Sequence, residues 1–198
     1  MTDQLKIDFE KILEKSDFSK NNINFKREQL NKFIENGFPN RKLENWKFLD
    51  IDQIIKKDIG VLSFYNDYSA TNKIDTSTLV NGLEHNKIIF INGRIEKIDF
   101  AYEDKSLIEI FDDVEVENKL NNKNSLIYLN SALSNKYYKI LIKKNYILKK
   151  PLIIYHFTND KMKSKNINLR LDFKLEQNSS LKLIDFFNDT SDKNFLNI

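Results

Sequence analysis

The sequence predicts an α+β protein in which an amino-terminal helical region comes before a β-rich region. Up to residue 36, apolar residues recur every three or four positions, which is the spacing of amphipathic helices. From residue 87 the pattern changes to short β-branched and alternating runs, which are typical of strands. We therefore expect a helical region over residues 1–62, a connection over residues 63–86 and a β-rich region over residues 87–198.

Two helices are the simplest interpretation of the first 36 residues. The first has a charged face opposite an apolar face made of Leu5, Phe9, Ile12 and Leu13. Residues 21–24 are predicted to form a loop, and helical spacing returns from Phe25 to Ile34. Gly37 should end this second helix because glycine adopts left-handed backbone angles, and Pro39 should fix an extended exit.

A short helix and a polar tract mark the end of the helical region. Asp50 or Asp52 can cap a helix with apolar residues at 51, 54 and 55, because a carboxylate accepts hydrogen bonds from free N–H groups of the first turn. Residues 63–78 are rich in Asn, Asp, Ser and Thr, and this composition favours an irregular connection. We place the domain boundary there.

A hairpin opens the β-rich region. Asn92-Gly93 suits a type I′ turn, and it joins the apolar runs over residues 88–91 and 94–100. A helix is expected over residues 124–133, a charged helix before it, and strands over residues 107–111, 138–142, 146–148, 151–158, 166–176 and 181–187, the last followed by a polar tract. Strands at this spacing build a sandwich, a barrel or a β-solenoid, and periodicity does not choose among these folds.

The composition argues against nucleic-acid and membrane partners. The 32 Lys and Arg residues are nearly balanced by 29 Asp and Glu residues, and the net charge of +3 is not gathered in a basic block. No apolar run approaches the roughly 20 residues that a membrane helix needs. The first 16 residues also lack the apolar core of a signal peptide, so we expect a cytoplasmic protein.

No residue pattern indicates an active site. Cysteine is absent, which removes disulfides, thiolate nucleophiles and the usual ligands of iron–sulfur clusters. His85 and His156 are the only histidines, too few for a metal site without acidic companions. The four glycines are isolated from one another, so no phosphate-binding loop is present. We expect no enzymatic activity, no catalytic residue, and no cofactor or metal bound by this chain.

Residues 37–50 form the most informative motif. They read Gly-Phe-Pro-Asn-Arg-Lys-Leu-Glu-Asn-Trp-Lys-Phe-Leu-Asp and hold the only tryptophan. This run resembles the P-x-R-K-x-E-x-W-K-Y-T signature of SufD in the SufB/SufD family, the scaffold proteins of the SUF system of iron–sulfur cluster assembly. Phe48-Leu49 replaces the Tyr-Thr pair of the family. The matching residues, for which a structural role is favoured, are Pro39, Arg41, Lys42, Glu44, Trp46 and Lys47.

Two further segments match the family in the same order. Residues 90–93 match its F-x-N-G segment, and residues 129–133 resemble its L-N-x-A-F segment. Trp46 is favoured to pack the helical hairpin onto the sheet, with anchoring of a partner as the alternative. The charged residues of the signature are interpreted as solvated helix charges, with an ion-pair cluster or a docking surface left open.

The resemblance implies a fold and a function. It implies that the chain corresponds to the amino-terminal half of a SufD-like protein, whose β-rich region starts a right-handed parallel β-helix that is truncated at its carboxyl end. It implies a non-enzymatic scaffold subunit of the SufBCD complex, which pairs with SufB and is driven by the ATPase SufC. The nascent iron–sulfur cluster would belong to the whole complex rather than to this segment.

Two other function classes remain open. A fragment of a β-helix enzyme acting on carbohydrates would need clustered charged side chains on one sheet face, which the sequence does not display. A plain protein-interaction module would combine the helical hairpin with a β-sandwich. Uncapped β-rich chains expose unpaired strand edges, so we also expect this chain to self-associate when it is expressed alone.

Overall fold

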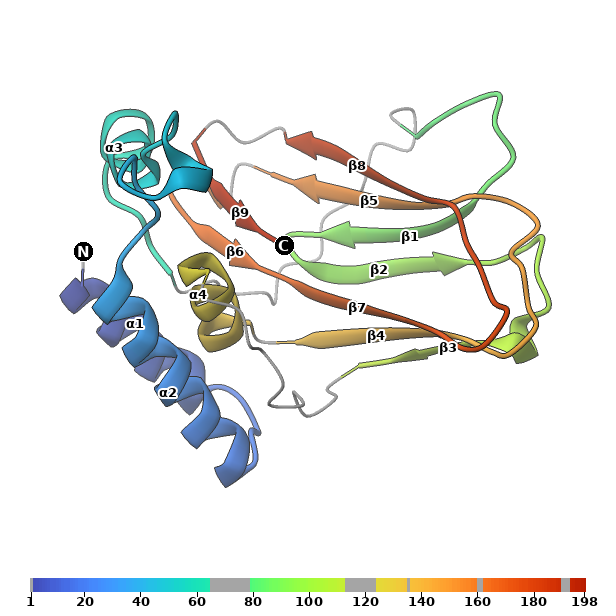
Figure 1. Cartoon of the computed structure of the whole chain (residues 1–198), viewed down its shortest axis with the longest axis horizontal. Helices are drawn as coiled ribbons and strands as arrows, with labels where there is room; N and C mark the ends of the chain where they lie inside the picture. Colours follow the sequence, from blue (N-terminus) through green and yellow to red (C-terminus); the bar gives the residue numbers. More distant parts are fainter. Residues whose placement is uncertain (1, 65–78, 113–123, 135, 160–161, 190–192) are drawn as a thin grey trace.

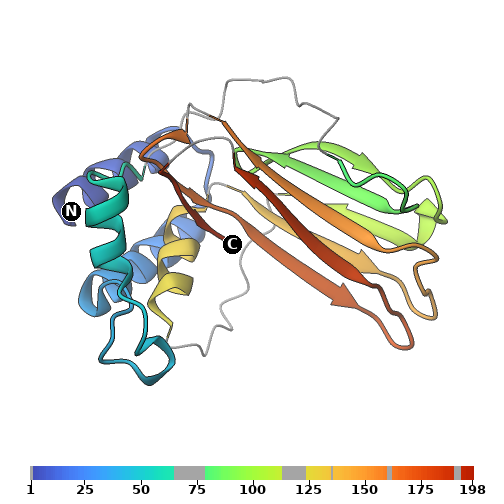
Figure 2. The same ribbon diagram turned by 90° about the horizontal axis from the view of Figure 1, so that it is seen from above.

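The computed structural model describes residues 2–64, 79–112, 124–134, 136–159, 162–189 and 193–198 (Figure 1). Helices gather at one end of the molecule and strands at the other, and the carboxyl terminus lies between the two (Figures 1 and 2). No helix within the described ranges is long and apolar enough to cross a membrane. Residues 65–78 lie outside these ranges, so the boundary over residues 63–86 stays a prediction.

The two predicted amino-terminal helices are confirmed as α1 (Thr2–Glu14) and α2 (Lys20–Asn36). The predicted loop over residues 21–24 is wrong, because these residues form the start of α2. The hydroxyl of Ser19 accepts a hydrogen bond from the N–H of Asn22 (3.2 Å). Because this cap precedes the polar residues 21–24, the helix begins before its first apolar side chains. Gly37 ends α2 with a positive φ of 67°, as expected.

Short helical segments complete the helical layer. They are the 3₁₀ helix η1 (Glu44–Trp46), α3 (Ile51–Ile54), the π-helix η2 (Ile55–Ile59) and α4 (Ser125–Leu133). The carboxylate of Asp50 accepts a hydrogen bond from the N–H of Gln53 (3.0 Å) and so caps α3. Of the two predicted capping residues, Asp50 is therefore the one that acts as the cap. Asn124 caps α4 in the same way through the N–H of Leu126 (3.0 Å). The charged helix predicted before α4 lies in residues 113–123, outside the described ranges.

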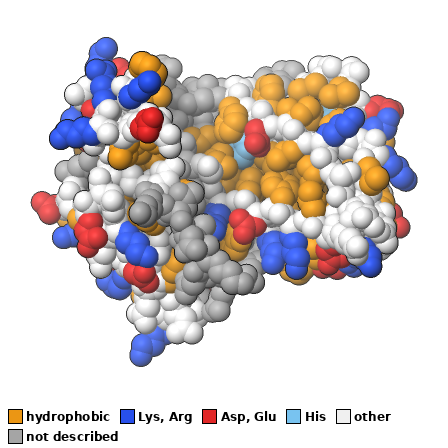
Figure 3. Space-filling model, viewed as in Figure 1, with side chains coloured by type: hydrophobic (Ala, Val, Ile, Leu, Met, Phe, Trp, Pro, Cys, Tyr) orange, Lys and Arg blue, Asp and Glu red, His pale blue; other side chains and the backbone are white. Residues whose placement is uncertain are grey.

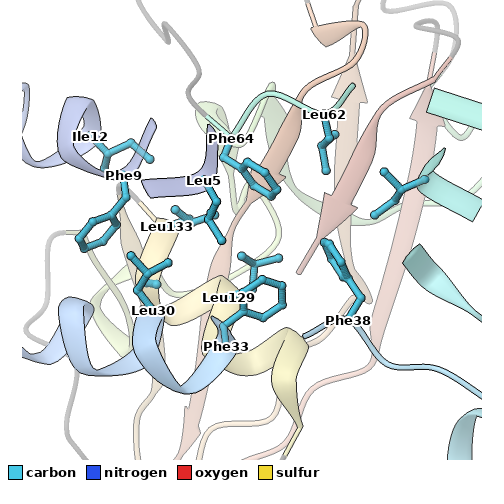
Figure 4. Close-up of a cluster of buried hydrophobic side chains, with 12 residues drawn as sticks. Leu5, Phe9, Ile12, Leu30, Phe33, Phe38, Leu62, Phe64, Leu129 and Leu133 are labelled. Atoms are coloured by element: carbon cyan, nitrogen blue, oxygen red, sulfur yellow. The ribbon is translucent and has the colours of Figure 1, made fainter. Parts of the chain in front are cut away.

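The first hydrophobic core joins these helices. Side chains of α1, α2 and α4 point toward one another, among them Leu5, Leu30 and Leu133 (Figure 4). The carboxylate of Asp8, which is buried on α1, accepts a hydrogen bond from the N–H of Phe64 (2.9 Å) and so holds that segment against the helix. Although α4 follows the first strands in the sequence, it packs with the amino-terminal helices.

Within the described ranges, the strands form three separate sheets. The four-stranded sheet has the order β2-β1-β5-β8, from β1 (Asn86–Ile91), β2 (Arg94–Asp99), β5 (Leu152–Thr158) and β8 (Leu183–Asp189). The three-stranded sheet has the order β3-β4-β7, from β3 (Ile108–Phe111), β4 (Tyr137–Ile142) and β7 (Arg170–Leu175). The pair consists of β6 (Asn166–Asn168) and β9 (Phe195–Asn197). A second core, including Phe90, Tyr138 and Ile154, lies between the two larger sheets.

The predicted hairpin is confirmed as β1 and β2, which pair antiparallel around Asn92 and Gly93, both with positive φ. The expected right-handed parallel β-helix is wrong. Both larger sheets begin with an antiparallel pair, β1–β2 or β3–β4, and the described strands form no closed or solenoid sheet. Among the described strands the parallel pairs are β1–β5, β5–β8, β4–β7 and β6–β9.

Two strand predictions are also wrong in detail. Residues 166–176 were expected to be one strand, but Leu169 separates β6 from β7, and its N–H donates to the carbonyl of Asn197 (3.0 Å). The strand predicted over residues 146–148 is reduced to a single bridge between Ile147 and Ser180. Strand β9 was not predicted, because three residues are too few to display a period.

Candidate functional site

The family-like motif forms a compact loop with a closed base. The N–H of Ile51 donates to the carbonyl of Pro39 (3.2 Å), which brings the two ends of residues 39–51 together. Turn hydrogen bonds fill the interior, including Leu49 N–H to the Trp46 carbonyl (2.8 Å). Compact surface loops with adjacent ends are frequently functional. We call residues 39–51 the signature loop.

The base of the signature loop is anchored in the first core. Phe38 and Pro39 are buried, and the ring of Phe38 lies edge-on to Phe33 on α2, at 5.1 Å between centroids. On its other side Phe38 meets the ring of Phe195 on β9, at 5.8 Å. Ile51 packs against the same core. The loop is therefore fixed to both the helices and the last strand.

The tip of the loop is exposed. Phe48 is 83% exposed, and Leu43 and Leu49 are 51% and 47% exposed. Within the described part of the chain, none of the signature charges forms an ion pair; these residues are Arg41, Lys42, Glu44 and Lys47. The ammonium group of Lys47 instead lies 4.9 Å from the ring centroid of Phe48. The tip thus combines apolar side chains with unpaired charges.

Trp46 lies in η1 and is only partly buried. It belongs to none of the three hydrophobic clusters found in the described residues. Its role in packing the hairpin onto the sheet therefore stays a prediction. Of the six signature residues, the structure buries Pro39 in the base and places the others around the exposed turns.

The family-like segment at residues 129–133 connects the helices to the strands. The side-chain amide of Asn130 on α4 donates to the carbonyls of Leu169 (2.9 Å) and Asn197 (2.8 Å). In return, the amide of Asn197 donates to the carbonyl of Leu126 (2.9 Å). These bonds fasten α4 to β9 and to the break between β6 and β7. Asn130 is therefore a structural residue at the junction of helices and strands.

His156 lies in an aromatic column that the sequence did not reveal. Its ring is stacked between Phe90 of β1 (5.5 Å) and Phe187 of β8 (4.7 Å), which are its register partners on the neighbouring strands. Its Nε2 lies 3.4 Å from a carboxylate oxygen of Asp185. Burial lowers the pKa of His156, and the hydrogen bond and charge of Asp185 oppose that shift. Only knowledge of strand register could have brought these residues together.

His85 lies on the opposite side of β5. Its Nε2 is 2.8 Å from the hydroxyl of Tyr155, and its Nδ1 is 2.7 Å from the carbonyl of Leu83. With the proton on Nδ1, this N–H donates a hydrogen bond to the Leu83 carbonyl, and Nε2 accepts a hydrogen bond from the tyrosine hydroxyl. Tyr155 also accepts from the N–H of Val80 (3.2 Å). Across the described ranges, no group of three or more histidine or acidic side chains could hold a metal ion.

Large apolar side chains are exposed along an edge strand of each of the two larger sheets. Strand β8 ends one sheet and β7 ends the other, and both expose large apolar side chains, including Ile184 (42%), Phe187 (55%) and Leu175 (46%). Figure 3 shows apolar side chains gathered over the strands on this face. This edge and the signature loop are the two surfaces best suited to contact other chains.

Comparison with known proteins identifies the family. The family model described as the SufBD protein N-terminal region matches residues 8–154, which include the signature loop, the hairpin and α4. No curated protein matches the sequence. The SufBD family takes part in SUF-system iron–sulfur cluster assembly; it is a scaffold family rather than a classical enzyme family, and its members work within the SUF complex. Since the match spans most of its 198 residues, the chain belongs to the SufBD family.

Proposed function

We propose that the chain is a SufD-type scaffold subunit of the SufBCD complex and supports the assembly of nascent iron–sulfur clusters without catalysing a reaction itself. The family match over residues 8–154 carries this proposal. The SufD-like order of the motif at residues 39–47 and the segment at residues 129–133 favours SufD over SufB. SufB and SufC are then the partners, and the cytoplasm is the place of assembly.

The composition indicates which part of the cluster site this chain would provide and which part its partners would provide. These 198 residues contain no cysteine, so they supply no thiolate to a cluster. The chain would contribute surface and rigidity, while ligands come from the partner subunits. The two hydrophobic cores and the Asn130 junction support this role, because they hold helices and sheets in one fixed arrangement.

The mechanism we propose is structural. Changes in SufC during its ATP cycle would alter the contact between SufB and this subunit, because a partner shifts a conformational equilibrium only when it binds two arrangements with different affinities. In this scheme the chain presents surfaces and performs no bond chemistry. The rival interpretation as a β-helix enzyme acting on carbohydrates loses its basis, since the described strands form no β-helix.

Co-purification tests the proposal. The affinity-tagged full-length gene product is expressed together with SufB and SufC and purified at low and at physiological salt. We expect both partners to be retained in fixed ratio. Expression of each pair of proteins separately shows whether SufC binds directly or through SufB. Retention of neither partner at either salt concentration would remove the proposal.

A further inference from the structure

We propose that the signature loop is a docking surface for an acidic protein segment that carries apolar side chains on one side. The inference goes beyond the scaffold function, because it assigns a contact that neither the family match nor the fold specifies. It does not depend on whether the chain is the SufD-type or the SufB-type subunit.

The first argument is the rigid exposure of apolar side chains. Phe48 is 83% exposed at the tip, and Leu43 and Leu49 are each about half exposed beside it. The Pro39–Ile51 hydrogen bond and the buried ring of Phe38 hold the base of the loop in place. A surface that is already fixed loses little conformational freedom when a partner binds, so its apolar area contributes more fully to affinity.

The second argument is charge. Arg41, Lys42 and Lys47 are exposed, and none forms an ion pair with a described residue, whereas Glu44 is the single carboxylate between them in the sequence. The two carboxylates that follow the tip directly are already engaged. Asp50 caps α3, and Asp52 accepts from Lys56 at 2.5 Å. The tip therefore has a positive excess that carboxylates of a partner would neutralise.

The third argument selects a protein rather than a membrane. Figure 3 shows basic, apolar and acidic side chains close together at the end of the molecule where α3 lies. Membrane binding of a surface scales with the apolar area that it buries, and Phe48 is the one apolar side chain of the signature loop that is well over half exposed. A protein segment can cover the half-exposed leucines from the side while its carboxylates meet the three cations.

A designed peptide provides the test. The probe is a fluorescent amphipathic helix with Glu on one face and Leu on the other, and its binding to the chain is followed by anisotropy. We expect binding that weakens as salt is added, because exposed charges are screened. A second peptide with Lys in place of every Glu should not bind. Equal binding of the two peptides, or no binding of the acidic one, would overturn the proposal.

Charge reversal in the loop sharpens this test. The triple variant Arg41→Glu, Lys42→Glu and Lys47→Glu should no longer bind the acidic peptide and should bind the basic one. The control carries the same change of charge at exposed positions elsewhere, as Lys6→Glu, Lys20→Glu and Lys97→Glu, and it should keep the original preference. Identical behaviour of the two triple variants would show that net charge alone drives binding, which contradicts the proposal.

The apolar contribution is tested separately. Phe48→Ser should lower the affinity for the acidic peptide about tenfold or more, as expected for a central interface side chain. Ile147→Ser, at a residue 64% exposed outside the loop, should leave binding unchanged. Circular dichroism and thermal unfolding confirm that each variant is folded. Tighter binding to phosphatidylglycerol vesicles or to single-stranded RNA than to the peptide would overturn the inference, and a failed co-purification with SufB and SufC would leave it intact.

Discussion

The side-chain nitrogen of Lys26 on α2 lies 2.6 Å from the carbonyl oxygen of Ser134, directly after α4. The same nitrogen is 3.3 Å from the Ser131 carbonyl and 3.5 Å from that of Ala132. The last carbonyls of a helix have no partner within the helix, and here a buried lysine supplies the donors. This contact ties together two helices that are far apart in the sequence.

Replacing Lys26 should therefore weaken the helical core. We expect Lys26→Met to lower the free energy of unfolding by about 1–3 kcal/mol, because buried carbonyls lose their donor. Lys20→Met changes an exposed lysine of the same helix, and its free energy of unfolding should stay within about 0.5 kcal/mol of that of the original chain. Urea unfolding measures both values. Equal midpoints for the two variants would show that the Lys26 contact contributes nothing.

Lys26 should also make stability depend on pH. Burial, together with the positive charge of Arg170, lowers the pKa of Lys26 from 10.5 to about 7. Between these values the unfolded chain holds a proton that the folded chain lacks, so the free energy of unfolding rises with pH by up to about 1.4 kcal/mol per unit. Urea unfolding between about pH 7.5 and 9.5 should show this rise, and Lys26→Met should abolish it. Parallel curves for both proteins would contradict the account.

The pair of His156 and Asp185 offers a third measurement. Burial lowers the pKa of His156 below 6.5, and Asp185 opposes the shift. Asp185→Asn removes the opposing charge, so a titration followed by NMR should give a still lower pKa for His156. Because unfolding takes up a proton below pH 6.5, the variant should also lose stability more steeply in acid. The resonance of His85 serves as the internal control, and a raised pKa of His156 would refute this interpretation.

The free sheet edges should cause self-association. Strand β8 ends its sheet and exposes Ile184 and Phe187, and unpaired edges of this kind bind further strands. Light scattering should show a mass that rises with protein concentration. Ile184→Lys places a charge on the edge and should shift the chain toward the monomer, whereas Ile147→Lys, in a loop, should not. A monodisperse monomer at every concentration would exclude association through this edge.

Local signals predicted local structure well. Gly37, Asp50 and the Asn92-Gly93 turn act through their own backbone neighbours, and each works in the structure as expected. The start of α2 is local as well: the Ser19 cap places residues 21–24 in the helix, although their polar composition alone favours a loop. Short-range chemistry can be predicted from sequence whenever the capping residue is recognised.

Long-range pairing could not be predicted. Alternation over residues 166–176 correctly indicates extended chain, but it does not indicate that β6 pairs with β9 while β7 pairs with β4. The β-helix came from family resemblance rather than from residues, and the antiparallel pairs contradict it. The signature loop was found from its motif, whereas the exposure of Phe48 depends on how the loop leaves the core.

Anaerobic reconstitution tests the central claim most directly. The chain alone, and the co-purified complex with SufB and SufC, are each incubated with iron and sulfide, desalted, and analysed for bound iron, sulfide and visible absorption. We predict that the complex retains a cluster and that the chain alone retains none, since it has no thiolate to offer. Stoichiometric iron and sulfide on the isolated chain would contradict the account.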